Sequence, residues 1–219
     1  MIIVFLGPPG SGKGTQAEQL REKYGFEHFD TGSQLRKEAD SGSDLGARIG
    51  GFINDGNFVT IEIIQELVLK FLRETSSERI MFDGFPRDLD QARVLDEGLA
   101  EIGRPLYCAL YLEIAPDTLL ERIMHRRMCP KCGTIYNLKT HAPRLDEVCD
   151  RDGEKLTQRA DDTPETFKTR LSNYMSKTVP VLEFYRGRES LCVIDADRSI
   201  EDVAASIVDE LGLDKHGEA

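Results

Sequence analysis

Four short runs of apolar residues recur along the chain, each followed by turn-forming residues. Runs this short and this uniformly apolar are typical of strands that are buried on both faces of a sheet. The predicted strands are Ile2–Leu6, Arg79–Phe82, Leu106–Leu112 and Leu191–Ile194.

Between these runs, helix-forming residues and apolar residues at helical spacing predict six helices. They are Lys13–Tyr24, Ile61–Leu72, Leu89–Ile102, Pro116 to about Met128, Pro164 or Glu165 towards Tyr185, and Ile200–Leu211. Strands that alternate with helices predict the α/β class with a parallel sheet.

Two segments interrupt this alternation. Asp30–Val59 is polar and rich in glycine, with only weak helical periodicity, and Arg126–Thr163 is polar, turn-rich and contains a cysteine cluster. A chain of 219 residues is the length of one domain with insertions. We therefore interpret both segments as insertions in a single core domain, and we expect the polar tail Asp214–Ala219 to be frayed.

The composition narrows the classes of function. Lysine and arginine number 28 against 39 acidic residues, a net charge of −11, which argues against a general nucleic-acid surface. No run of eighteen apolar residues occurs, so we expect no membrane-spanning helix. The N-terminus lacks the basic region and cleavage site of a secretory signal, and we expect a cytoplasmic protein.

The first predicted strand is followed by a glycine-rich loop, Gly7–Thr15, that opens a predicted helix. This context favours a phosphate-binding loop, in which backbone N–H groups and the helix N-terminus face phosphate oxygens. Lys13 would supply a mobile cation to the transferred phosphate. Gly14 stands between Lys13 and Thr15, where Ser or Thr usually follows the lysine, so magnesium ligation by the loop is less certain. The alternative is an ordinary glycine- and proline-rich turn.

Three of the five cysteines lie between Cys129 and Cys149, at the spacing of a zinc ribbon. Two tight turns, Cys129–Cys132 and Cys149–Asp152, would each present two ligands, with Asp152 where a fourth cysteine is usual. Four protein ligands make a closed and hence structural site. His141, Asp146 and Asp150 are rival fourth ligands, and unliganded thiols are the alternative. We expect the remaining cysteines, Cys108 and Cys192, to lie in the core.

Several motifs occur in one order along essentially the whole chain. They are GPPGSGKGTQA from Gly7, DTGSQLR from Asp30, DGNFVT from Asp55, FDGFPR from Phe82 with Gln91, RIMHRR from Arg122, QRADD from Gln158, and Arg170. In these motifs the chain resembles the adenylate kinase family. The loop and the DGFPR motif are individually specific, whereas the other motifs are weak when taken one at a time.

The resemblance implies a P-loop three-layer fold with a central parallel five-stranded sheet. It divides the chain into a core (residues 1–29, 60–125 and 164–219), a monophosphate-binding insertion (30–59) and a lid insertion (126–163). The implied reaction is ATP + AMP ⇌ 2 ADP with Mg²⁺, and many bacterial members carry structural Zn²⁺ in the lid. ATP, AMP and ADP are the implied partners of a protein that is mostly monomeric in this family.

The resemblance also assigns residues to the two nucleotides. The ATP-binding residues would be Gly10, Ser11, Gly12, Lys13, Gly14, Thr15, Arg126, Ile135, Tyr136 and Arg198. The AMP-binding residues would be Thr31, Arg36, Asn57, Phe58, Val59, Gly84, Phe85, Pro86, Arg87, Gln91, Arg159 and Arg170. The catalytic set would be Lys13, Arg87, Arg126, Arg159 and Arg170, and the zinc ligands would be Cys129, Cys132, Cys149 and Asp152. Ser33, Gln34 and Arg198 depart from the commoner family pattern, which we expect to tune the reaction without changing it.

This chemistry suits the residues present. A phosphate oxygen of AMP is already charged, so it needs no general base, and we find no histidine–carboxylate or serine–histidine arrangement. Positioning and charge stabilisation must then carry catalysis, and arginine binds phosphate oxygens bidentately. Asp83, at the end of a predicted strand, could orient magnesium-bound water or cap the next helix. Asp161 and Asp162 are expected to position Arg159 or to cap the helix that begins at Pro164.

Three other functions remain open from the sequence. A kinase for another nucleoside monophosphate is the nearest, because the amide of Gln91 can rotate to suit other bases. A zinc-ribbon nucleic-acid module with a vestigial loop is opposed by the acidic charge balance. A P-loop ATPase without an acceptor site would not need the set of separate arginines.

Overall fold

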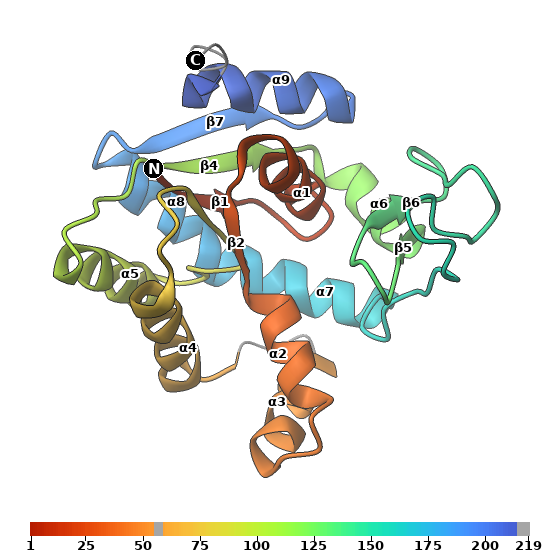
Figure 1. Ribbon diagram of the computed structural model, residues 1–219, viewed down its shortest axis with the longest axis horizontal. Helices are drawn as coiled ribbons and strands as arrows, with labels where there is room; N and C mark the ends of the chain where they lie inside the picture. The colour runs from red at the N-terminus through yellow and green to blue at the C-terminus, as the bar shows by residue number, and fades with distance from the viewer. Residues whose placement is uncertain (55–58, 214–219) are drawn as a thin grey trace.

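A five-stranded parallel sheet forms the centre of the computed structural model, which describes residues 1–54 and 59–213 (Figure 1). The strand order is β2-β3-β1-β4-β7. The bounds are β1 Ile2–Leu6, β2 Glu27–Asp30, β3 Ile80–Asp83, β4 Cys108–Glu113 and β7 Leu191–Asp195. The predicted fold class is confirmed. The hydrophobic pattern missed β2, which is an edge strand with one fully buried residue, Phe29.

Helices cover both faces of this sheet. One face packs against α1 (Lys13–Tyr24), α6 (Leu119–Met124) and α9 (Ile200–Leu211). The other packs against α4 (Ile61–Glu74), α5 (Leu89–Glu101) and α8 (Val179–Arg186). The strand β1 shows why its sequence is apolar throughout: Ile2, Val4 and Leu6 join one core, and Ile3 and Phe5 join the other. A central strand covered on both faces has no polar side.

Side-chain caps begin several of these helices. The carboxylate of Asp88 accepts a hydrogen bond from the backbone N–H of Gln91 at the start of α5, and Ser199 caps α9 in the same way. Such caps satisfy N–H groups that have no partner within the helix. The predicted bounds of α1 and α9 are confirmed, and those of α4 and α5 differ by one or two residues.

The long helix predicted from Pro164 is present in three connected parts. They are α7 (Pro164–Asn173), a π-helical turn (Tyr174–Thr178) and α8. Thr163 caps α7 by accepting a hydrogen bond from the N–H of Thr166. Capping by Asp161 or Asp162, which the sequence suggested, is therefore wrong.

The interrupting segment at residues 30–59 folds into two helices, α2 (Thr31–Ala39) and α3 (Asp44–Asn54). They pack together at the lower edge of the molecule in Figure 1. Leu35 and Ile49 are buried and join the core that also contains α4 and α5. This packing places Thr31 and Arg36 beside the ends of β2 and β3.

The segment of residues 126–163, called the lid segment below, projects to the right in Figure 1. Its regular part is an antiparallel pair, β5 (Arg126–Met128) and β6 (Ile135–Asn137). The helix predicted from Pro116 to about Met128 therefore ends early: Pro116–Thr118 is a 3₁₀ turn, α6 ends at Met124, and the last residues form β5. The lid segment has its own small cluster of buried residues, Cys129, Tyr136, Cys149 and Leu156.

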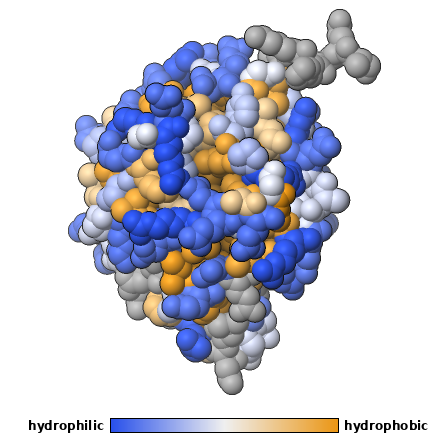
Figure 2. Space-filling model, turned by 90° about the vertical axis from the view of Figure 1, so that its left-hand side faces the viewer, coloured by the Kyte–Doolittle hydropathy of each residue, from blue (hydrophilic) through white to orange (hydrophobic). Residues whose placement is uncertain are grey.

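The face at the left of Figure 1 is shown in space-filling form in Figure 2, where hydrophilic residues surround a smaller hydrophobic area near the centre. Among the described residues, none of the helices combines the length and the apolar composition needed to cross a membrane.

Candidate active site and metal cluster

A cavity of about 940 Å³ opens at the carboxyl ends of the central strands. The loop after β1 lines it, together with the ends of β2 and β3 and one side of the lid segment. Ligands of open α/β sheets bind at this edge, outside the carboxyl ends of the strands. All the residues that the sequence assigned to ATP line this cavity: Gly10, Ser11, Gly12, Lys13, Gly14, Thr15, Arg126, Ile135, Tyr136 and Arg198.

The glycine-rich loop closes around the amine of Lys13. Its Nζ donates hydrogen bonds to the carbonyl oxygens of Gly7 at 2.8 Å and Pro8 at 2.9 Å. Burial lowers the pKa of Lys13 to about 8, opposed by the charge of Asp83. Gly12 caps α1 with a φ of 95°, a left-handed conformation that glycine adopts without strain. An anion in the loop would therefore meet the α1 N-terminus and a cation held close to it.

The unusual Gly14 lies against the lid segment. A Cβ atom built on Gly14 would lie 2.9 Å from Cδ1 of Ile135, and the Ile135 side chain would have to shift. The absence of a side chain thus allows β6 to approach the phosphate-binding loop. The same position lies 3.9 Å from a carboxylate oxygen of Asp83, so the loop and the end of β3 are also adjacent.

Five arginines from separate segments reach the same cavity: Arg36, Arg87, Arg126, Arg159 and Arg170. Two of them are held by neighbouring carboxylates. Arg126 binds Asp162 through two nitrogens, one of them Nε at 2.9 Å, and Arg170 donates to Asp161 at 3.1 Å. Asp161 and Asp162 thus hold Arg170 and Arg126 by hydrogen bonds, whereas the sequence suggested Arg159 as the partner.

Burial and the mutual repulsion of these cations lower the pKa values of two of them. Burial first, and then the charges of Arg126 and Arg36, lower the pKa of Arg159 to about 9. Burial and the charge of Arg126 lower the pKa of Arg170 to about 10. Both remain charged at neutral pH. Nη2 of Arg159 donates to the sulfur of Met128 at 3.5 Å, and its Nε is buried without a hydrogen-bond partner among the described residues. That Nε is available to an anionic ligand.

Arg87 is held on three sides. Its Nε donates to the carbonyl oxygen of Gly84 at 2.7 Å, and its backbone N–H donates to Oε1 of Gln91 at 2.8 Å. Thr178 in the π-helical turn donates to the Arg87 carbonyl oxygen at 2.7 Å. Gly84 has a φ of 77°, and a Cβ there would lie 2.9 Å from the Arg87 guanidinium. Burial lowers the pKa of Arg87, opposed by Asp83 and Asp30.

A smaller pocket adjoins the cavity beside α2 and α5. Thr31, Arg36, Val59, Gly84, Arg87, Gln91 and Arg170 line it, and all were assigned to AMP from the sequence. Pro86 and Arg159 line the larger cavity. The hydroxyl of Thr31 is buried without a partner among the described residues, which leaves it free for a ligand. Phe85 is fully buried against Phe82 and lines neither space, and Asn57 and Phe58 lie outside the described residues.

Two titratable residues that line the cavity, His28 and Asp30, were given no role in the sequence analysis. His28 was not singled out, yet its Nε2 is buried 3.9 Å from Asp83. Asp30 caps α2, and hydrogen bonds and the charge of Arg36 hold its pKa low against the effect of burial. Both lie in β2, the strand that the hydrophobic pattern missed; Asp30 begins the DTGSQLR motif without a role assigned to it there, and no sequence signal indicated His28.

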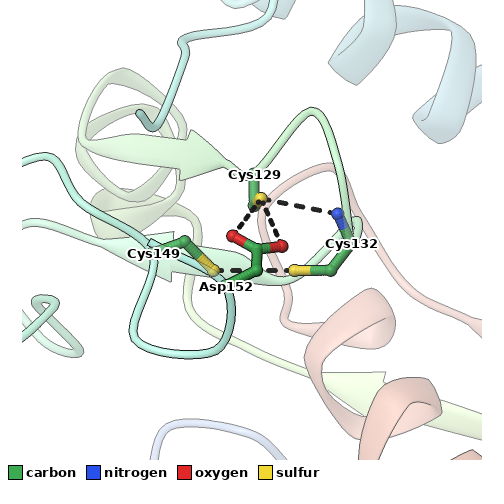
Figure 3. Close-up of side chains that lie close together, drawn as sticks. All are labelled: Cys129, Cys132, Cys149 and Asp152. Carbon is green, nitrogen blue, oxygen red and sulfur yellow. Dashed lines mark hydrogen bonds between the residues drawn. The ribbon is translucent and has the colours of Figure 1, made fainter. Parts of the chain in front are cut away.

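In the lid segment, Cys129, Cys132, Cys149 and Asp152 converge, with one ligand atom from each within 4.8 Å of the others (Figure 3). The Sγ atoms of Cys132 and Cys149 are 3.6 Å apart, and Cys129 Sγ is 3.4 Å from both Asp152 oxygens. A tetrahedral zinc with bonds of about 2.3 Å separates its sulfurs by roughly 3.8 Å. The donor set and spacing therefore fit a metal of this kind.

Two similar turns hold these ligands. Gly133 donates to the Cys129 carbonyl and Gly153 donates to the Cys149 carbonyl, each at 3.0 Å. A hydrogen bond from the N–H of Glu154 lowers the pKa of Asp152 to about 2, whereas burial raises the pKa of Cys129 to about 11. Of the rival fourth ligands, His141 stacks on Tyr136 and Asp150 accepts from the N–H of Arg144. Neither belongs to the cluster, and nor does Asp146.

The sequence profile of the adenylate kinase family matches residues 5–190 of this chain. An adenylate kinase of Fervidobacterium nodosum is 37% identical over 213 residues, which cover 97% of this chain and 98% of that protein. An adenylate kinase of Clostridium perfringens is 38% identical over 216 residues, covering 98% and 100%. One of Petrotoga mobilis is 38% identical over 207 residues, covering 94% and 95%.

The chain belongs to the adenylate kinase family. Its activity is that of a nucleoside monophosphate kinase, the reversible reaction ATP + AMP ⇌ 2 ADP. The family implies ATP with magnesium as a substrate. In this adenylate kinase the cysteine cluster lies in the lid and could hold a metal ion.

Proposed function

We propose that ATP binds in the arginine-lined cavity and AMP in the smaller pocket that adjoins it. The ATP phosphates would lie in the loop Gly10–Thr15, against the amine of Lys13 and the α1 N-terminus. Arg126, Ile135, Tyr136 and Arg198 would complete this site. The observation that carries the proposal is the convergence of Lys13 and five arginines from separate segments on one cavity that adjoins a smaller pocket.

AMP would occupy the smaller pocket, with its phosphate towards the cavity. Arg36 and Arg87 would bind that phosphate, and the hydroxyl of Thr31 and the amide of Gln91 would face the base. Val59, Gly84 and Pro86 would line the site, and Asn57 and Phe58 keep their predicted assignment to it. Because the Phe85 side chain is in the core, any contact from this residue would come from its backbone.

Where the cavity meets the smaller pocket, the phosphoryl group would be surrounded during transfer by Lys13, Arg87, Arg126, Arg159 and Arg170. A phosphate oxygen of AMP attacks the γ-phosphorus of ATP as the bond from that phosphorus to the β–γ bridging oxygen breaks. The attacking oxygen is already ionised, so no side chain has to remove a proton. The arginines bring two polyanions together and stabilise the charge that shifts to ADP.

Magnesium bound with ATP would neutralise phosphate charge. Asp83 fits the part of orienting its water ligands, because this carboxylate ends β3 beside Gly14 and influences Lys13. The three thiols and the carboxylate of the lid fit zinc better than a harder cation. We assign structural Zn²⁺ to Cys129, Cys132, Cys149 and Asp152, since four protein ligands leave no open position for chemistry.

We further propose that residues 30–59 act as the monophosphate-binding insertion and residues 126–163 as a lid that closes over ATP. Closure would exclude water, so that the phosphoryl group goes to AMP in preference to water. The monomeric state, the cytoplasmic location and the absence of a nucleic-acid partner stay predictions.

A coupled assay for ADP tests this proposal. ATP and AMP together should give ADP at least about 10²-fold faster than either nucleotide gives it by itself, since transfer needs both sites. Formation of ADP from ATP without AMP at a similar rate would contradict the two-site arrangement and favour an ATPase. Replacing AMP by UMP, CMP or GMP then tests the acceptor site, and an equal rate with any of them would contradict selection of adenine by Thr31 and Gln91.

A further inference from the structure

Arg151 connects the metal-binding part of the lid to the first helix of the core. It lies in the turn between Cys149 and Asp152, and its Nη1 is 2.8 Å from Oε1 of Glu18 and 2.5 Å from Oε1 of Glu22. Glu18 and Glu22 are four residues apart on α1, so they present their carboxylates on one face of that helix. One guanidinium therefore bridges two carboxylates across the cavity mouth, which all three residues line.

This bridge is specific to one interface. Among the ion pairs of residues 1–54 and 59–213, those of Arg151 are the ones that join the lid segment to α1. Arg126 and Arg127 pair with acidic residues of the lid segment itself, and Lys139 pairs with Glu121 on α6. The helix α1 begins at Lys13, so a contact on α1 positions the lid relative to the loop proposed to hold the ATP phosphates.

Two further contacts lie next to this bridge on the lid segment. Nη1 of Arg151 also lies 3.3 Å from Oγ1 of Thr134, in the other ligand-bearing turn of the lid. The next residue, Ile135, is the one whose side chain lies against Gly14 of the loop. The lid thus meets the loop and its helix at adjacent points, one apolar and one ionic.

We propose that Arg151 is a positioning residue that holds the lid closed over ATP through Glu18 and Glu22. The inference rests on the proposed place of ATP under the lid. The side chains of Arg151 and Glu22 are 45% and 42% exposed and that of Glu18 is 25% exposed, so the pairs are of the modest, salt-screened kind. A contact of this strength favours the closed lid without preventing product release, which needs the lid to open.

The test compares four variants with the parent: Arg151→Gln, Glu18→Gln with Glu22→Gln, the combination of all three, and Lys131→Gln. Lys131 is the matched control, because it lies between two cluster cysteines, carries the same charge and has no ion pair among the described residues. For each protein, kcat, the KM values for ATP and for AMP, and the metal content are measured. Arg151→Lys tests whether a shorter cation restores the parent behaviour.

We expect Arg151→Gln to raise the KM for ATP about threefold, the scale of an exposed ion pair. The KM for AMP should change by less than about 1.5-fold, and kcat should not fall, because an easier opening of the lid does not slow product release. The glutamate double variant should give the same rise, and the triple variant no further rise. Arg151→Lys should regain at least part of the parent affinity, and Lys131→Gln should match the parent.

Any of three results would overturn the inference. The KM for ATP could be the same in Arg151→Gln and Lys131→Gln, or Arg151→Gln could raise the KM for ATP as much in the glutamate double variant as in the parent. In the third, Arg151→Gln would raise the KM values for ATP and for AMP equally. If Arg151→Gln loses metal, the glutamate variant, which leaves the lid sequence intact, decides between the outcomes. Failure of the parent enzyme to form ADP from ATP and AMP would instead contradict the proposed function itself.

Discussion

The core and the lid segment of this adenylate kinase are stabilised by different interactions. In the core, whole strands are buried: Val4, Leu6, Ile80 and Phe82 are at most 2% exposed, and helices cover both faces of the sheet. In the lid segment, the buried cluster consists of two residues of the candidate metal cluster, Cys129 and Cys149, together with Tyr136 and Leu156. The core can fold by apolar burial, whereas a lid with so few buried apolar side chains would depend on the proposed metal and on hydrogen bonds.

This difference has a consequence for the active site, because both regions contribute arginines to the same cavity. Arg87 and Arg170 extend from core elements, and Arg126 and Arg159 extend from the lid segment. Arg87 is held by hydrogen bonds with Gly84, Gln91 and Thr178, and Arg170 is held by Asp161 at the end of the lid segment. If the lid closes over ATP as proposed, Arg126 and Arg159 would approach the phosphates with it, which would couple closure to charge stabilisation.

The largest expected effect is the loss of a core arginine. Arg87→Ala should lower kcat/KM by at least ~10³, about 4 kcal/mol of transition-state stabilisation. The fold should survive, because Arg87 lines the cavity. Arg93→Ala is the matched control, since Arg93 is exposed on α5 and pairs with Asp90. Steady-state kinetics decide the matter, and a loss of tenfold or less in Arg87→Ala would remove it from the catalytic set.

The next largest effect is on stability: substitution of a buried core leucine should lower the free energy of unfolding far more than substitution of a lid leucine. Leu95 is fully buried, and Leu95→Ala should lower the free energy of unfolding by ~2–5 kcal/mol, through lost burial and a cavity. Leu145 in the lid is 67% exposed, and Leu145→Ala should change it by less than about 0.5 kcal/mol. Urea unfolding measures both, and equal losses would contradict the contrast between the two regions.

Removing a lid ligand should separate metal binding from chemistry. Cys129→Ser should lose the metal and lower the melting temperature by several degrees, equivalent to ~1–3 kcal/mol in a domain of this size. Activity at low temperature should stay within about tenfold of the parent, as expected for a structural site. Cys192→Ser, outside the cluster, should keep the metal.

Metal analysis, a melting curve and the coupled assay on the same preparation give these three readouts. Abolished activity with an unchanged melting temperature would mean that the metal is catalytic.

The smallest expected effect is on the selection of adenine over other nucleotide bases. Gln91→Ala should weaken discrimination between AMP and other monophosphates by ~1–2 kcal/mol, the scale of a lost hydrogen bond. Gln91 accepts a hydrogen bond from the backbone N–H of Arg87, and its amide donates to Asp88 at 3.2 Å. Gln91→Glu keeps the acceptor and removes the amide donor, but it places a second carboxylate beside Asp88, so its melting temperature must match the parent before selectivity is compared. If Gln91→Glu selects AMP as the parent does, the amide does not read the base.

Local sequence signals predicted most of the core and the loop. The helices α1 and α9 were predicted with their bounds because capping residues and glycines mark their ends. The strand β2 was missed because its residues Glu27 and His28 give no apolar run, and β5 was missed because its two arginines read as the end of a helix. β2 forms by pairing with β3, which is distant in the sequence, whereas β5 forms a local antiparallel hairpin with β6 that has no apolar alternation to mark it.

The residues of the site also fall into those that short sequence motifs predicted and those that only tertiary contacts bring together. The loop residues and the cluster ligands lie in short motifs, so spacing was enough to propose them. The pairing of Arg126 with Asp162 depends on the approach of the two ends of the lid segment, and that of Arg170 with Asp161 depends on how this segment meets α7. The contact of Arg151 with α1 depends on the position of the lid over the core. No local pattern contains that information.

Hydrogen exchange before and after removal of the metal tests the contrast between the two regions most directly. A chelator strips the purified enzyme, metal analysis verifies the loss, and zinc is then added back. We expect the amides of residues 126–163 to lose protection and regain it with zinc, while the amides of β1 and β3 keep theirs, because apolar burial holds the sheet. Unchanged protection in the metal-free lid, or an equal loss in the sheet, would contradict the account.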